Sequence, residues 1–164
     1  MTIPALKQAD DWVPASLCRR LAAAGYDTIL CLALLVVATA LYKLTQMAWY
    51  GEPRLRTMSE SGVLDHDPLL STLLLSLPLA FFAGFWTRTG QTLGMQAWGI
   101  RVQNGNGSAI SVRQALLRCL TAIASWLCLG MGWWWMLFDS RQCTWHDLGS
   151  RSQVVRVRHK KTDP

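Results

Sequence analysis

RRLAAAGYDTIL, residues Arg19–Leu30, opens an apolar run and places one carboxylate, that of Asp27, inside it. Nearly every residue from Leu21 to Tyr42 is apolar or small. This length is sufficient for a helix to cross a bilayer at about 1.5 Å per residue. A carboxylate near the middle of such a helix costs roughly 2.5–3.5 kcal/mol to insert. Asp27 therefore needs a partner or a task, and Arg20 lies about two turns earlier on nearly the same helix face.

The composition of this 164-residue chain is typical of a single membrane domain. Apolar residues make up 51% of it, it has nine tryptophans, and its charges lie mostly outside three apolar runs. The net charge of +6 is located in the segments that flank these runs, where lipid head groups and the positive-inside rule explain it. We therefore expect the lipid bilayer as a partner and no nucleic acid.

The cysteines and histidines do not predict a metal site or a disulfide framework. The number of cysteines is odd, at five, and no CxxC pair occurs. Cys143 and His146 have a ligand-like spacing, but a metal needs more ligands than these two. His66 between Asp65 and Asp67 is better explained as part of a solvated loop. We expect no metal and no cofactor.

The first two apolar runs predict two complete transmembrane helices. The first helix is expected over Ser16–Lys43, and it is too long and too charged to be a cleaved signal peptide. The second is expected over Leu69–Trp86, with kinks at Pro78 and Gly84. Between them, residues 43–68 are expected to form an acid-rich loop.

The region after the second run predicts a small β-structure. Ile100–Gln103 alternates polar and apolar residues, the NGNG turn signal follows at 104–107, and Ser108–Ile110 is expected as a return strand. Ser111 is a predicted helix N-cap. A further strand is expected over Val154–Arg158.

The third apolar run, Ala115–Phe138, is not expected to be a simple crossing. The acid-rich loop predicts that residues 43–68 lie outside and that the N-terminus and residues 87–114 are cytoplasmic. A single third crossing puts the basic C-terminal tail outside and separates the two predicted strands. We therefore expect the chain to turn back near Gly130–Gly132.

The predicted fold is thus an α-helical membrane protein with two full transmembrane helices and a third apolar segment that is re-entrant or a short helical hairpin. A small cytoplasmic-side β-hairpin pairs with a C-terminal strand. The expected organisation is an N-terminal tail (1–15), a single membrane domain (16–158) and a basic C-terminal tail (159–164).

Charged residues near the apolar segments are the candidate site. Asp27 has three candidate charge partners, Arg20, Arg113 and Arg118. Two interpretations remain open, because pairing and function are compatible. The cluster holds the helices together, or it forms an ion or proton relay. The relay residues are Asp27, Asp139, His146 and Asp147.

Four motifs in this order resemble the RDD family of bacterial membrane proteins, over about residues 12–158. The family is named for one arginine and two aspartates, and the resemblance assigns these to Arg20, Asp27 and Asp147, with Asp139 as the rival for the last. A Gly-Thr-type pair that relatives often have after His-Asp is replaced here by LGSRS. The motifs are PASLCRRLAAAGYD (14–27), GQTLGMQAWGIRV (90–102), RQALLR (113–118) and HD (146–147).

The resemblance implies a bacterial inner-membrane location and, as the usual suggestion for the family, transport of an undefined ligand. One hypothesis is a small cation/proton transporter or transport-associated protein in which Asp27 titrates. The chain is small and has no obvious inverted repeat, so such a transporter is expected to be a homo-oligomer. The alternative is a non-catalytic membrane scaffold or assembly partner. No nucleophile–base pair, metal set or phosphate loop supports an enzyme, so we expect no catalytic residues.

Overall fold

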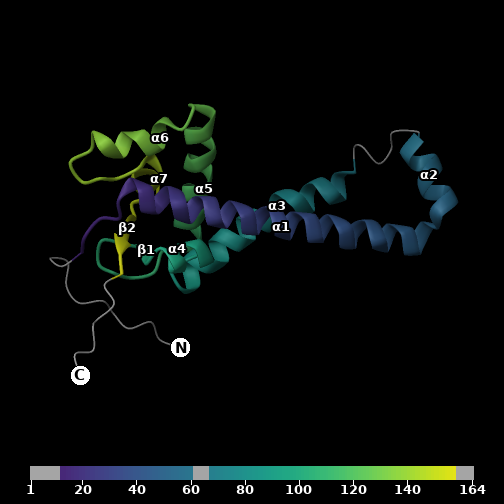
Figure 1. Ribbon diagram of the computed structural model, residues 1–164, viewed down its shortest axis with the longest axis horizontal. Helices are drawn as coiled ribbons and strands as arrows, with labels where there is room; N and C mark the ends of the chain where they lie inside the picture. The colour runs from purple at the N-terminus through teal and green to yellow at the C-terminus, as the bar shows by residue number, and fades with distance from the viewer. Residues whose placement is uncertain (1–11, 61–66, 158–164) are drawn as a thin grey trace, which may run out of the picture. The chain divides into compact units, whose positions relative to one another are not determined.

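The computed structural model describes residues 12–60 and 67–157, and these residues form two compact units (Figure 1). One unit consists of residues up to Asp27 together with those from Phe82 onward, and the other comprises Thr28–Phe81. The helices α1 (Leu17–Tyr50) and α3 (Pro68–Arg88) contribute to both units. Within the described residues, these two helices are individually long and apolar enough to cross a membrane, as predicted.

The predicted loop over residues 43–68 is wrong in its first part. Helix α1 continues to Tyr50 because no helix breaker follows Lys43 until Gly51, which has φ +75° and donates its N–H to the Met47 carbonyl at 3.0 Å. A short helix, α2 (Glu52–Glu60), follows directly. Asp65 and His66, which were considered with Asp67 as ligands for a metal ion, lie outside the described residues.

Asp67 joins the two long helices within the unit formed by Thr28–Phe81. Its Oδ1 accepts hydrogen bonds from the first turn of α3, at Leu69 N (3.0 Å) and Leu70 N (3.2 Å), as an N-cap residue does. Its Oδ2 accepts from the Tyr42 hydroxyl at 2.7 Å and from Gln46 Nε2 at 2.9 Å, both on α1. The hydrogen bond from the Tyr42 hydroxyl makes the largest contribution to lowering the pKa of Asp67 below its usual value.

The third apolar run is bent, as predicted. Helix α5 (Val112–Leu127) is followed by α6 (Met131–Trp134) and the 3-10 turn η2 (Trp135–Leu137), and the two parts differ in direction by 108°. The break contains Gly130, with φ +77°. A Cβ on Gly132 would lie 3.1 Å from the Trp145 Cβ and closer still to the Ser125 side chain. Glycine at this position therefore permits α6 to pack directly against its neighbours.

The two predicted strands pair with each other. The strands β1 (Ile100–Gln103) and β2 (Gln153–Arg156) are antiparallel, with Arg101 opposite Val155 and Gln103 opposite Gln153. Val155 also forms a bridge with Pro14, so the end of the predicted N-terminal tail lies along the other edge of β2.

The return strand expected over Ser108–Ile110 does not form. The turn itself is present, because Asn104 N donates to the Ser108 carbonyl at 2.9 Å. However, the Asn104 side chain donates to the Ala109 carbonyl at 2.9 Å. In a paired return strand, this carbonyl would accept a hydrogen bond from the backbone of the neighbouring strand instead. The backbone then leads into the capping box of Ser111 and Gln114, which starts α5 as predicted.

A small apolar core holds together the unit that consists of residues up to Asp27 and from Phe82 onward. Two short helices complete this unit. Helix α4 (Leu93–Ala97) precedes β1, and α7 (Trp145–Ser150) precedes β2. The surface of the unit carries large exposed side chains such as Leu129, Phe138 and Trp126, as expected for residues that face lipid. The buried core residues are Ala15, Ala23, Trp86, Ile100, Val102, Ile110, Ala115 and Val154.

Candidate functional site: a buried Arg–Asp–Arg cluster

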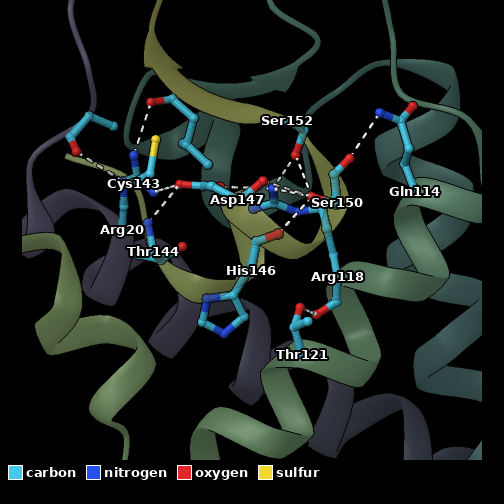
Figure 2. Close-up of polar contacts among 12 residues, drawn as sticks. Arg20, Gln114, Arg118, Thr121, Cys143, Thr144, His146, Asp147, Ser150 and Ser152 are labelled. Carbon is cyan, nitrogen blue, oxygen red and sulfur yellow. Dashed lines mark hydrogen bonds and ion pairs between the residues drawn. The ribbon is translucent and has the colours of Figure 1, made fainter. Parts of the chain in front are cut away.

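Asp147 lies at the centre of a buried charge cluster (Figure 2). It occupies the first turn of α7, where its Oδ2 accepts a hydrogen bond from the Thr144 backbone N–H at 3.2 Å. Its two carboxylate oxygens each accept from a different arginine, Arg20 on Oδ2 and Arg118 on Oδ1. One carboxylate therefore joins the start of α1 to α5 and α7.

Arg20 is bound through each of its guanidinium nitrogens. Besides the ion pair of Nη1 with Asp147, its Nε donates to the Ala15 carbonyl at 3.0 Å. Its Nη2 donates to the carbonyls of Gln142 and Val154, each at 3.2 Å. Arg20 thus connects the first turn of α1 with the segment before α7 and with β2.

Arg118 approaches Asp147 from α5. Its Nη1 is 2.8 Å from Asp147 Oδ1 and also donates to the hydroxyls of Ser150 and Ser152. Its guanidinium carbon lies 5.3 Å from the centre of the Trp86 ring, within the range of a cation–π contact. The two serines belong to the LGSRS segment that directly follows Asp147 in the sequence.

The electrostatics of the cluster keep Asp147 ionised. Asp147 is 1% exposed, and the two arginines are each 5% exposed. Burial alone raises the pKa of Asp147, but the guanidiniums of Arg118 and Arg20 outweigh burial and hold this pKa below its usual value. The three groups together carry a net charge of +1, from two arginines and one aspartate.

Asp27 has a different environment, and its predicted pairing with Arg20, Arg113 or Arg118 is wrong. Its Oδ2 accepts from the Thr92 hydroxyl, and its Oδ1 accepts from the Gly94 N–H at 2.8 Å. It forms no salt bridge within residues 12–60 and 67–157.

The geometry of α1 explains the difference. Seven residues of helix separate Arg20 from Asp27 by about 10 Å along the axis, and Arg20 is already engaged by Asp147.

Thr92 and Gly94 are site residues that sequence reasoning missed. Thr92 is the N-cap of α4 and accepts the Met95 N–H at 3.3 Å, while its own hydroxyl donates to Asp27. A Cβ on Gly94 would lie 2.8 Å from Asp27 Oδ1 and closer still to the Ala23 carbonyl. The signal available in the sequence was a threonine directly before a short helical segment, because threonine is a favoured N-cap residue.

Asp139 and His146 do not join the carboxylates in a hydrogen-bonded relay within the described residues. Asp139 Oδ2 accepts the Cys143 N–H at 2.8 Å. The His146 ring points away from the Asp147 carboxylate in Figure 2, and it lies 4.9 Å from the Trp133 ring, centre to centre. Its Nε2 is buried without a partner, and burial, followed by the charge of Arg118, lowers the pKa of His146 to about 4.

The remaining candidates form no metal site in the part of the chain that the structure describes. No group of three or more His, Cys, Asp or Glu side chains is placed to hold a metal ion there. Arg113, the third predicted charge partner, is exposed on α5.

Two apolar helices, a bent helix pair and a buried ion cluster define an integral membrane domain. The chain belongs to the RDD family, whose family model matches residues 14–151, and this confirms the predicted membership. No curated protein and no solved structure matches it. Asp139 and Asp147 both lie within the matched residues.

Proposed function

We propose that this RDD domain is a non-catalytic membrane scaffold or assembly partner in which the Arg20–Asp147–Arg118 cluster is structural. One observation carries this proposal. Both oxygens of Asp147 are bound by arginines, and all three side chains are buried. A carboxylate held in this way must break two ion pairs to take up a proton or a cation. This makes the cluster a poor carrier and a strong link between α1, α5 and α7.

The same cluster supports Asp147, rather than Asp139, as the second aspartate of the family signature. Arg20, which the resemblance assigns as the signature arginine, donates to Asp147. Asp139 instead caps the local backbone at Cys143. A signature arginine and aspartate that are 127 residues apart in sequence and bonded to each other form one structural unit.

A second candidate function is transport of a small cation or of protons, with Asp27 as the titrating group. Its specific support is the absence of a charged partner for Asp27 among the described residues, where only Thr92 and Gly94 hold its carboxylate. A carboxylate held by neutral donors in an apolar helix takes up a proton or a cation without breaking an ion pair. A transporter built from this chain would be a homo-oligomer.

Asp27→Asn discriminates between the two functions. Asparagine keeps an oxygen that accepts the hydrogen bond from the Gly94 N–H. Its NH2 group donates a hydrogen bond to the Thr92 hydroxyl oxygen, but the side chain does not titrate. Under the scaffold proposal, everted vesicles that contain this variant or the wild-type protein show the same pH-dependent cation flux as vesicles without the protein. A flux that the wild-type protein supports and Asp27→Asn abolishes, at equal protein abundance, would establish transport and refute the scaffold role.

We also propose a bacterial inner-membrane location with the N-terminus and residues 87–114 in the cytoplasm and residues 43–68 outside. The acid-rich composition of residues 43–68 and the arginines of residues 87–114 support this orientation. The pairing of β1 with β2 supports a common side for residues 87–114 and the C-terminal end, since paired strands cannot lie on opposite sides of a bilayer.

A further inference from the structure

Arg101 is a buried cation without an anion. It is 7% exposed, and no hydrogen bond or ion pair connects its side chain to another residue in the described part of the chain. Its Nε is fully enclosed and has no partner. Burial lowers its pKa, but an arginine side chain stays charged in any protein environment. A guanidinium that is largely removed from water and lacks a counterion is unfavourable, so an anion that reaches it would stabilise this arrangement.

The chain itself offers no carboxylate for Arg101 among the residues that surround it in sequence. Aspartate and glutamate are absent between Arg88 and Phe138. In the described part of the same unit, Asp27, Asp139 and Asp147 are each engaged elsewhere.

A second orphan polar group lies on the same face of the sheet. Gln103 is fully buried, and neither its Oε1 nor its Nε2 has a hydrogen-bond partner. Side chains two residues apart on a strand share a face, and so do directly opposed residues of paired strands. One face of the β1–β2 sheet therefore carries three polar side chains, Arg101, Gln103 and Gln153, together with the buried Val155 opposite Arg101. The other face carries Ile100 and Val102 of the apolar core.

We propose that this face binds a phosphate-type oxyanion, which is the phosphate of a lipid head group or free inorganic phosphate. A guanidinium binds two phosphate oxygens at once through its planar set of donors. The amides of Gln103 and Gln153 supply neutral donors on the same face. The bound anion neutralises Arg101 and satisfies Gln103, which accounts for both orphan groups with one ligand.

The connection to α3 supports a lipid head group as one source of this phosphate. The apolar α3 ends at Arg88, and two residues later the Gly90 carbonyl accepts the Val102 N–H at 2.8 Å. A Cβ on Gly90 would lie 2.9 Å from Arg101 Nε. The absence of a side chain at Gly90 therefore allows the Arg101 side chain to pack against the backbone that follows α3. The partly exposed Trp98 is an aromatic residue typical of this zone.

Thermal unfolding of the purified full chain in a phosphate-free maltoside detergent tests the proposal. One arm adds inorganic phosphate, with sodium chloride at equal ionic strength as its control. The other arm adds dioctanoyl-phosphatidylglycerol, with dioctanoylglycerol, which lacks the phosphate, as its control. We expect a saturable rise in Tm with at least one of the phosphate ligands and none with its control. A response to the lipid alone identifies the head group as the source, and a response to both identifies a general phosphate site.

Matched variants locate the site. Arg101→Gln is expected to weaken the apparent affinity about tenfold or more, while the same change at the exposed Arg113 leaves it unchanged. If Arg101→Gln does not fold, Gln103→Met provides the test, with an expected loss of about threefold to tenfold. A Tm that neither phosphate ligand raises would overturn the proposal. The proposal would also be overturned if the folded Arg101→Gln variant, or Gln103→Met where it replaces that variant, bound the phosphate ligand with wild-type affinity. An equal loss of affinity in the Arg113→Gln variant would overturn it as well.

Discussion

Asp147→Asn should lower the free energy of unfolding by about 3 kcal/mol. Removing one partner of a buried ion pair costs about 3–5 kcal/mol, because the remaining charge is left uncompensated. The structure favours the lower end of this range. After the change Arg20 still has three carbonyl acceptors, and Arg118 still has the hydroxyls of Ser150 and Ser152. The asparagine oxygen also continues to accept on one side, whereas its NH2 group is a donor, so one arginine loses its hydrogen bond to residue 147 along with the negative charge.

The assay is thermal unfolding of the purified protein in detergent, together with protein abundance in the membrane. A loss of about 3 kcal/mol corresponds to a fall in Tm of about 6–12 °C for a chain of this size. Asp139→Asn is the matched control, because Asp139 is only partly buried and accepts a single backbone N–H within the described residues. An Asp147→Asn protein with a Tm within about 2 °C of wild type would refute the reasoning, as would an equal effect of Asp139→Asn.

Two further predictions concern pH and orientation. The pKa of His146 falls from 6.5 to about 4 on folding, so the unfolded chain binds more protons than the folded chain between these pH values. The free energy of unfolding should therefore decline as the pH falls from 6.5 to about 4, by up to about 3 kcal/mol. His146→Gln should remove this dependence of Tm on pH, and an unchanged pH profile would contradict the role of His146. A reporter fused to the C-terminus should be active only in the cytoplasm, and activity outside the cell would contradict the re-entrant topology.

The helical part of the fold was largely predictable, because it follows from properties that act locally. Apolar runs of sufficient length predicted α1 and α3, and charge balance together with Gly130–Gly132 predicted the bend after α5. The helical extension of α1 to Tyr50 and the presence of α2 were not predicted, since polar residues after Lys43 resemble a loop in sequence. The missing return strand has a similar cause, because the Asn104 side chain competes with strand pairing.

The partners within the site were predictable only in part, because sequence gives spacing on one helix but not contacts between elements. Arg20, Arg118 and Asp147 were named as members of one cluster, and the structure joins them. The spacing of Arg20 and Asp27 on one helix face suggested a pair, but each finds its partner on another element. The contact of Asp27 with Gly94 depends on how closely α4 approaches α1, and no sequence pattern predicts this distance.

The three residues that the resemblance assigns to the family signature therefore combine two physically different situations. Arg20 and Asp147 form one ion pair, so their contributions to stability should depend on each other, as is normal for residues in direct contact. Asp27 is held by Thr92 and Gly94 through hydrogen bonds alone. Its replacement by an isosteric amide removes a charge that no described cation compensates, so it should be better tolerated than the same change at Asp147. If transport occurs in this domain, Asp27 is the one of these three residues that can change its charge without breaking the ion pairs that join α1 to α5 and α7.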